Sequence, residues 1–332
     1  MKNNNENYVI ISPIRNEAEY LPGVIESMVN QTVLPAEWVV VDDGSTDDTA
    51  KILKEAANQY KWINYVKKPD RGSRSVGPGV VETFNYGFER LNYKNYNFIC
   101  KMDGDLEFGR EYFETLLRYF RIDPQLGSAS GKIFIKENSG KMVEERTSDE
   151  MTCGGINFYR REAFEDIGGF VKEVMWDGIA YHMARIHGWR TRSIRNNKLK
   201  IIHHRLMGSS QENIFHGRLR WGRGQYFMGT HPLYILGIAT YRLIERPYII
   251  GGIGILLGYM ISAVKRIQRF NDKSFRKSLH AWQLERLKIG KRLEKLSVPP
   301  AKLYNQKFVD NFHVTQNVNS FHCSLQPIHP KI

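Results

Sequence analysis

Short apolar runs alternate with segments of helical periodicity along the first 135 residues of the chain. The apolar runs predict buried strands at Tyr8–Ser12, Trp38–Val41, Ile63–Val66 and Asn97–Met102. The segments that follow predict helices at Glu17–Asn30, Asp48–Gln59, Gly79–Leu91 and Arg110–Phe120. This alternation predicts an α/β fold, in which a mainly parallel sheet has helices on both faces. Ligands of such sheets bind at the carboxyl ends of the strands.

The α/β pattern continues after a stretch rich in charged residues, 136–150, which predicts a loop. The pattern beyond it predicts strands at Gly154–Arg160, Trp189–Ile194 and Leu199–Ile202, and helices at Arg161–Ile167 and Asp177–His187. We therefore expect one α/β domain over residues 1–205.

Two apolar runs, residues 226–241 and 248–264, mark the C-terminal part of the chain. The second run has 17 residues and no charge, so as a helix it would be about 25 Å long, short of the ~30 Å hydrocarbon core. Basic residues flank the runs on both sides, whereas a spanning helix has one positive side. The pattern favours short helices that lie in the membrane interface or dip into it. A single transmembrane span and buried core helices are the alternatives.

Residues 206–296 are therefore expected to form a basic, helical, membrane-associating region. Residues 297–332 are mostly polar and contain Pro299-Pro300 near their start, which predicts a disordered tail. The first seven residues contain no apolar segment, so we expect no secretory signal at this end.

The net charge of +13 is divided unequally along the chain. Residues 1–189 hold 23 Lys and Arg against 29 Asp and Glu, and residues 190–332 hold 25 against 6. The N-terminal part is thus mildly acidic, and the C-terminal part, which contains the apolar runs, carries +19. Positive charge beside apolar runs suits anionic lipid headgroups better than nucleic acid. The three cysteines have no CxxC spacing, which argues against a disulfide framework or a structural zinc site.

Acidic residues follow two of the predicted strands. Asp103-Gly104-Asp105 follows Asn97–Met102, and Asp42-Asp43-Gly44-Ser45 follows Trp38–Val41. Two carboxylates at a strand end can hold a hard divalent cation, which in turn binds phosphate oxygens. Asp103-Gly104-Asp105 alone would more simply be a turn, but a second acidic strand end at the same edge favours a binding site.

At this level of detail the sequence resembles the family 2 glycosyltransferases, which are inverting enzymes of the GT-A (Rossmann-like) fold with nucleotide-sugar donors. The resemblance covers roughly residues 8–205 and is specific as a set of five segments in order. These segments are YVIISPIRNEAEYLPGVIESMVNQT, VVVDDGSTDDT, KMDGDLEF, CGGINFYRREAFEDIGGF and WDGIAYHMARIHGWRTR.

The resemblance implies a donor site at the carboxyl ends of the strands, made by Asn16, Glu17, Asp42, Asp43 and Asp103. Arg71 and Arg74 lie in a Gly-rich loop and are candidates for contacts to phosphate, with a solvated loop as the alternative.

The resemblance also implies a divalent cation, Mg²⁺ or Mn²⁺, held by Asp103 and Asp105. Glu107 and His204 are candidates for further ligands. The alternatives are a solvated acid at a helix start for Glu107 and local packing for the pair His203-His204.

Asp177 occupies the position of the family's general base, eleven residues before Gly188, although Trp176 replaces the Glu that usually precedes it. One carboxylate suffices to remove the proton of an acceptor hydroxyl. On the acceptor side we expect Trp176, Arg220 and Trp221. Arg220-Trp221 matches the end of the Q-x-x-R-W segment of processive synthases, but Gly217 replaces its Gln. This departure favours the transfer of a single sugar.

These features predict an inverting, metal-assisted glycosyltransferase at the cytoplasmic face of the cell membrane. Its expected partners are a nucleotide-diphosphate sugar, a lipid-linked or saccharide acceptor of polysaccharide or glycolipid synthesis, and an anionic membrane surface. A polyprenyl-phosphate sugar synthase is the alternative. A basic nucleic-acid-binding protein is a more remote alternative, and we expect no nucleic-acid partner.

Overall fold

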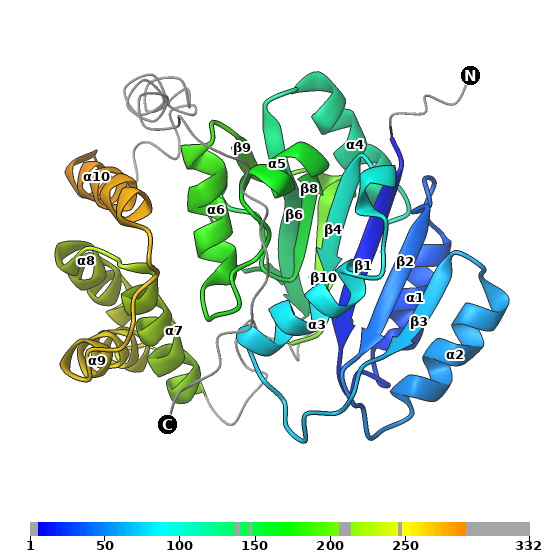
Figure 1. Cartoon of the computed structure of the whole chain (residues 1–332), viewed down its shortest axis with the longest axis horizontal. Helices are drawn as coiled ribbons and strands as arrows, with labels where there is room; N and C mark the ends of the chain where they lie inside the picture. Colours follow the sequence, from blue (N-terminus) through cyan, green and yellow to red (C-terminus); the bar gives the residue numbers. More distant parts are fainter. Residues whose placement is uncertain (1–5, 137–139, 146–147, 206–213, 245–247, 290–332) are drawn as a thin grey trace.

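The computed structural model describes residues 6–136, 140–145, 148–205, 214–244 and 248–289 (Figure 1). The segment just after residue 205, where the α/β domain was expected to end, and the expected tail 297–332 lie outside the described residues.

Strands and helices alternate through the first part of the chain as the sequence predicts. Up to the acidic motif the elements are β1 (Tyr8–Ile14), α1 (Leu21–Val29), β2 (Glu37–Asp42), α2 (Thr49–Gln59), β3 (Ile63–Lys67), α3 (Pro78–Phe88) and β4 (Phe98–Met102). Those that follow are β5 (Leu106–Phe108), α4 (Tyr112–Ile122), β6 (Leu126–Lys136), β7 (Met142–Glu144), β8 (Ile156–Arg160), α5 (Arg161–Asp166), α6 (Trp176–Ile186), β9 (Arg190–Ile194) and β10 (Lys200–His203).

The strands form one sheet in the order β3-β2-β1-β4-β8-β6-β10-β5, with β7 and β9 both paired to β6. The strands β3, β2, β1 and β4 are parallel, as predicted. Beyond β4 the sheet is mixed, because β8 is antiparallel to both β4 and β6, and β5 is antiparallel to β10. The expectation of a mainly parallel sheet therefore holds only for its first half.

The sequence analysis missed β6, the longest strand. Its first half, Leu126–Gly131, is buried but consists largely of Gly, Ser and Ala. Because small residues give neither an apolar run nor an alternating pattern, they carry no strand signal. Their size is required by the packing: a Cβ built on Gly131 would lie 1.6 Å from the Leu199 carbonyl oxygen.

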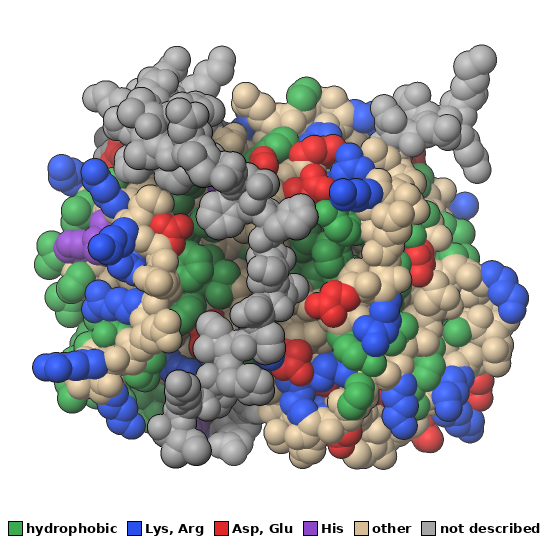
Figure 2. Space-filling view, viewed as in Figure 1, with side chains coloured by type: hydrophobic (Ala, Val, Ile, Leu, Met, Phe, Trp, Pro, Cys, Tyr) green, Lys and Arg blue, Asp and Glu red, His purple; other side chains and the backbone are tan. Residues whose placement is uncertain are grey.

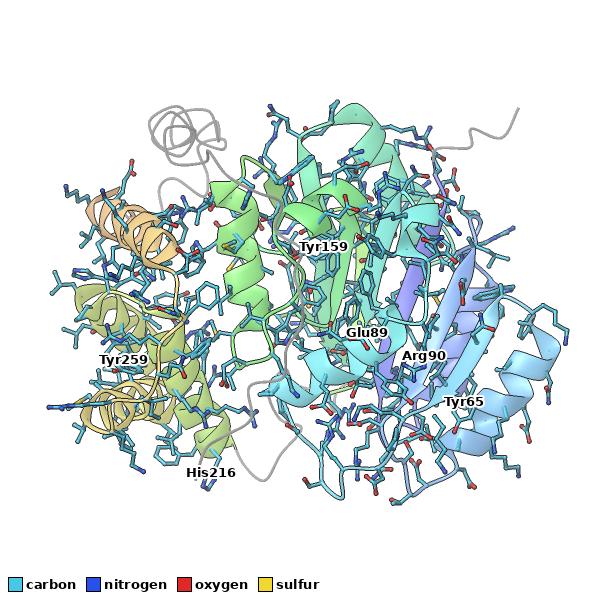
Figure 3. The ribbon with its side chains drawn as sticks, in the orientation of Figure 1. Tyr65, Glu89, Arg90, Tyr159, His216 and Tyr259 are labelled. Atoms are coloured by element: carbon cyan, nitrogen blue, oxygen red, sulfur yellow. The ribbon has the colours of Figure 1, made fainter. Side chains whose placement is uncertain are left out.

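Helices cover both faces of the sheet, as predicted. Successive residues of β1 point to opposite faces: Tyr8 and Ile10 belong to the core under α1, α2 and α4, and Val9 and Ile11 to the core under α3, α5 and α6. Tyr159 of β8 lies on the second face, 5.7 Å from the ring of Phe164 in α5 (Figure 3).

The C-terminal part forms four helices at one side of the sheet, beyond α6 (Figure 1). They are α7 (Ile214–Met228), α8 (Pro232–Leu243), α9 (Ile250–Val264) and α10 (Lys273–Ile289). The apolar run 226–241 is thus divided between two helices by a turn at Gly229, whose φ is +87°. Tyr259 of α9 lies inside the group and donates a hydrogen bond to the Thr230 carbonyl (Figure 3).

The four helices are held to the α/β part by α6. Ile179 of α6 shares an apolar cluster with Met228 of α7 and with Phe275 and Leu279 of α10. Within the described residues, no helix is long and apolar enough to cross a membrane.

Gly131→Ala should destabilise the fold, because the backbone of residue 199 cannot move away without disturbing β10. We expect a loss of about 2 kcal/mol or more in the free energy of unfolding, measured by urea denaturation. Gly109→Ala is the matched control, because nothing lies within 4 Å of a Cβ built there. An equal stability of the two variants would contradict this packing.

Candidate active site

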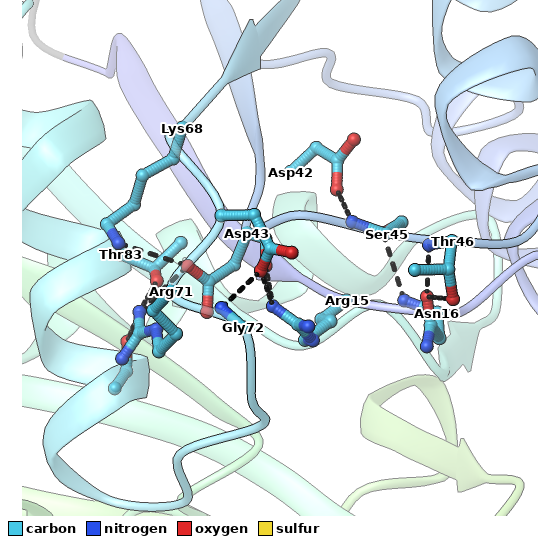
Figure 4. A network of polar contacts seen from close by, with 12 residues as sticks. Arg15, Asn16, Asp42, Asp43, Ser45, Thr46, Lys68, Arg71, Gly72 and Thr83 are labelled. Carbon is cyan, nitrogen blue, oxygen red and sulfur yellow. Dashed lines mark hydrogen bonds and ion pairs between the residues drawn. The ribbon is translucent and has the colours of Figure 1, made fainter.

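Loops from several strands meet at the carboxyl edge of β1, β2 and β4, where the sequence predicts the site. The β1–α1 and β2–α2 loops are tied together by hydrogen bonds: Asn16 Oδ1 accepts from the Thr46 amide (2.8 Å), and the Asn16 amide donates to Ser45 Oγ (3.0 Å) (Figure 4). Asn16 has a φ of +55°, an uncommon conformation that such cross-links maintain.

Asp42 and Asp43 are both buried at the end of β2, but they have different partners. Asp42 accepts hydrogen bonds from the Ser45 amide (2.8 Å) and the Tyr65 hydroxyl (3.1 Å). Burial and the negative charge of Asp42 raise the pKa of Tyr65 to about 12. Asp43 pairs with Lys68 (3.1 Å) and Arg71 (2.8 Å) (Figure 4).

Both arginines of the Gly-rich loop form contacts with neighbouring loops and helices. Arg71 donates to Asp43 and, at 3.0 Å, to Thr83 Oγ1, so it links the end of β2 to α3 in this structure. Arg74 pairs with Glu17 at 3.2 Å. Their roles in phosphate binding stay predictions.

A second group of charges links the β1–α1 loop to the acidic motif. Arg205, just after β10, donates to both carboxylate oxygens of Glu17 at 2.7 Å and pairs with Asp105 Oδ2 at 2.8 Å. His203 Nε2 lies 3.2 Å from the same oxygen of Asp105. Burial by itself would raise the pKa of Asp105. The contacts to His203 and Arg205 outweigh this effect and bring that pKa well below its ordinary value.

Asp103 faces the predicted base across two glycines. Its Oδ1 accepts from the buried Lys101 ammonium at 2.5 Å, and Lys101 also donates to the Gly154 carbonyl at 2.7 Å. A Cβ built on Gly154 would lie 2.9 Å from Asp177 Oδ2, and one on Gly155 would lie 3.5 Å from Asp103 Oδ2. Gly154-Gly155 therefore forms the floor between the two carboxylates.

Asp177 is well placed to act as a base. It lies in the first turn of α6, where its Oδ1 accepts from the Gly178 amide at 2.8 Å. Burial, with a further contribution from the charge of Asp103, raises its pKa above the ordinary value. Met175, immediately before α6, has a φ of +68°, so two of the described non-glycine residues with positive φ flank this site.

The acidic motif fits a divalent cation in part. Asp105 Oδ2 and His203 Nε2 are close enough to share an ion, and both are ligand types that Mn²⁺ accepts. However, the described residues contain no group of three His, Cys, Asp or Glu side chains that could hold a metal. Arg205 and Lys101 balance the carboxylates in this structure, so a cation would need further ligands from a diphosphate.

The predicted further ligands Glu107 and His204 pair with each other instead, at 2.8 Å. The ring of His204 also stacks on Tyr20 at 5.0 Å. It is the neighbouring His203 that reaches Asp105, because only His203 is a buried member of strand β10. The metal role of Glu107 and His204 has no geometric support here.

The three predicted acceptor-side residues lie on two helices. Trp176 is buried at the start of α6, with its ring 5.2 Å from the Lys101 ammonium. Arg220 lies one helical turn before Gly224 on α7, and a Cβ built on Gly224 would lie 2.4 Å from Met175 Cγ. Residues four apart share a helix face, so Arg220 is on the side of α7 that faces the start of α6. Trp221 packs instead in the cluster around α9.

Sequence reasoning missed the cations Lys101 and Arg205 and the floor at Gly154. Lys101 left a signal: it is a charged residue inside the apolar run of β4, and such a residue needs a buried partner. Arg205 left none, because nothing in the sequence indicates that it reaches Glu17, 188 positions away.

Comparison with known proteins identifies the family of the N-terminal part of the chain. Residues 9–168 match the sequence model described as glycosyl transferase family 2. This part of the chain is a family 2 glycosyltransferase domain.

Curated relatives match the domain at low identity. The chain is 24% identical over 184 residues to chondroitin synthase of Escherichia coli, and the match covers 52% of this chain and 25% of that synthase. It is 20% identical over 251 residues to the poly-beta-1,6-N-acetyl-D-glucosamine synthase of Staphylococcus aureus, and this match covers 67% of the chain and 58% of that synthase. The chain thus spans between a quarter and three fifths of the length of these two relatives.

Solved structures share the fold of this glycosyltransferase over most of the chain. The mannosyltransferase PcManGT of Pyrobaculum calidifontis, in complex with GDP-Man and Mn²⁺, has a TM-score of 0.50 and 15% identity and covers 93% of this chain and 86% of its own. TarS 1-349 of Staphylococcus aureus, in complex with UDP-GlcNAc, has a TM-score of 0.51 and 18% identity and covers 92% and 89%. At these identities the likeness establishes the GT-A-type fold.

Gly154→Ala should displace the Asp177 carboxylate, because the new methyl group would lie 2.9 Å from Asp177 Oδ2. We expect kcat for sugar transfer to fall roughly tenfold to a hundredfold with little change in thermal stability. Gly155→Ala is the matched control, since its Cβ would make a tight contact only with the flexible end of Leu106 (3.3 Å) and would meet Asp103 Oδ2 at an ordinary 3.5 Å. If both variants lose activity equally, the displacement of Asp177 is not the cause.

Proposed function

We propose that the protein is an inverting, metal-assisted glycosyltransferase that moves one sugar from a nucleotide-diphosphate sugar to a lipid-linked or saccharide acceptor. Its pathway would be the synthesis of a cell-surface polysaccharide or glycolipid. The observation that carries the proposal is the placement of Asp177 across the Gly154-Gly155 floor from Asp103. The proposed base is thereby held close to the acidic motif.

In the proposed reaction, an Asp177 oxygen accepts the proton of the acceptor hydroxyl as that hydroxyl oxygen attacks the anomeric carbon. The bond from this carbon to the diphosphate breaks, and the electron pair leaves with the nucleoside diphosphate. Lys101 and Arg205 place positive charge beside the leaving group. A bound divalent cation, held by Asp105 with Asp103 or His203, would neutralise charge on the diphosphate.

The relatives support the substrate class. Chondroitin synthase and poly-beta-1,6-N-acetyl-D-glucosamine synthase are named for polysaccharide synthesis. Structures of similar fold hold GDP-Man with Mn²⁺ and UDP-GlcNAc, which supports a nucleotide-sugar donor and a divalent cation. Gly217, in place of the Gln of processive enzymes, supports the transfer of a single sugar.

A lipid phosphate is the second acceptor that the site could serve, as in a polyprenyl-phosphate sugar synthase. The observation in its favour is the arginine pair Arg220 and Arg223 on α7, close to the start of α6. A phosphate acceptor is already ionised and needs no base.

Donor binding should appear as thermal stabilisation by one nucleotide class. We expect a rise in Tm with UDP-, GDP- or dTDP-sugar in the presence of Mn²⁺, because a ligand of the folded state stabilises it. Asp105→Ala should abolish most of the rise, and Asp177→Asn should keep it, since Asp177 faces the acceptor. No rise with any donor would overturn the proposed function.

The raised pKa of Asp177 predicts the pH dependence of transfer. The base must be deprotonated, so kcat/KM should fall as the pH drops through an apparent pKa above the ordinary 3.8 of an aspartate. Asp177→Asn should lower kcat with a hydroxyl acceptor by a factor on the order of 10² or more. Full activity of Asp177→Asn with a polyprenyl phosphate would instead identify the phosphate-acceptor enzyme.

A further inference from the structure

Large apolar side chains are exposed on one part of the molecule. Of the 17 large hydrophobic residues that are exposed in the described part of the chain, 12 fall between residues 233 and 264. They are Leu233, Leu236, Leu243, Ile244, Tyr248, Ile249, Ile250, Ile253, Leu257, Met260, Ile261 and Val264. We call this surface, formed by α8, α9 and the described residues next to their facing ends, the apolar face. Patches of this kind on a soluble surface mark interaction sites.

The helix α9 exposes large apolar side chains, whereas a water-soluble helix exposes polar ones. Five of its seven buried residues are Gly or Ser, and the other two are Ile255 and Tyr259. A Cβ on Gly258 would lie 2.1 Å from the Leu219 carbonyl of α7, and one on Gly252 would lie 2.3 Å from the Ala239 carbonyl of α8. Most of its large aliphatic residues point outward instead, and Val264 is 82% exposed. Small residues between helices and large apolar residues outside are typical of helices in lipid.

The outward residues of α9 form a continuous stripe. Ile250, Ile253, Leu257, Met260, Ile261 and Val264 follow a spacing of three or four residues apart from one adjacent pair. Such a spacing places them on one side of the helix along its whole length. The stripe is therefore a surface that a flat apolar layer can cover.

Positive charge borders the apolar face. Lys265, Arg266 and Arg269 are exposed at the end of α9, and Arg242 lies at the end of α8. The described residues from 214 to 271 contain no Asp or Glu. In Figure 2 the edge of the molecule over these helices shows green and blue side chains with almost no red.

The positive charge beside the apolar face indicates which kind of partner binds there. If a second copy docked on the same face, it would bring these four cations against their own equivalents, which is repulsive. An anionic lipid surface attracts them. The length of α9, 15 residues, gives about 22 Å, which is less than the ~30 Å needed to cross.

We propose that the apolar face of α8 and α9 docks into the interface of an anionic bilayer, with its basic border on the headgroups. The cytoplasmic leaflet, which carries the negative surface potential of a cell membrane, is the surface of this chemistry.

This docking would also place the active site. The α7 helix packs on α9 and, through Gly224, on Val174 and Met175, which precede Asp177 by three and two residues. The base is thus joined to the docked helices by one layer of packing. Resting on the proposed function, this geometry presents Asp177 to an acceptor carried in or at the membrane.

Vesicle binding tests the proposal without donor or acceptor, so its result is independent of transfer activity. The full chain is mixed with vesicles of phosphatidylcholine alone or with phosphatidylglycerol, and the bound fraction is measured by flotation. We expect binding to the anionic vesicles that weakens with salt, and at least tenfold weaker binding for the double variant Ile253→Asp with Leu257→Asp. Ile122→Asp is the matched control, because Ile122 is 73% exposed on α4, in the α/β part.

Charge reversal separates the two parts of the interface. Lys265→Glu with Arg266→Glu should weaken binding to anionic vesicles at least tenfold and leave binding to neutral vesicles unchanged, whereas Lys51→Glu, at an exposed position of α2, should change neither. Circular dichroism confirms that each variant is folded. Absence of vesicle binding by the unaltered protein would overturn the proposal, as would a dimer in light scattering that the Ile253→Asp, Leu257→Asp variant disrupts, since the face would then bind protein.

Discussion

The site depends on the neutralisation of carboxylates that are buried at one edge of the sheet. An isolated carboxylate is costly to bury and would be protonated instead. Here four of the carboxylates pair with cations: Asp43 with Lys68 and Arg71, Asp103 with Lys101 of the same strand end, and Asp105 and Glu17 with Arg205. These pairs fix the loops around the strand ends before any ligand arrives.

The C-terminal helices share this dependence on buried charge. Arg286 of α10 donates to Glu150, which also accepts from the Tyr181 hydroxyl of α6. Arg185 of α6 lies over the ring of Trp282, 5.5 Å from its centre. The helix α6, which carries Asp177 in its first turn, is therefore held between the sheet and α10. A displacement of the C-terminal helices would be transmitted to Asp177 through α6.

Local patterns in the sequence were sufficient for the first half of the sheet, because apolar runs such as Trp38–Val41 are buried on both faces and end in turn residues. They failed for β6 and β5. The buried half of β6 is made of small residues, and β5 has three residues between the acidic motif and a glycine. These strands exist because neighbouring strands offer them hydrogen-bonding partners. No local pattern encodes such partners.

The sequence by itself determined the family, the acidic strand ends and the position of Asp177, because these depend on residue types at short spacings. Only the tertiary structure decided which charges meet. It placed His203 and not His204 beside Asp105, brought Arg205 to Glu17, and set Gly154 beside the carboxylate of Asp177. It also turned the aliphatic side of α9 outward, whereas the sequence gives only its apolar length. Which charges pair and which side of a helix faces outward both depend on contacts between distant segments. No local stretch of the sequence determines the free energies of these contacts.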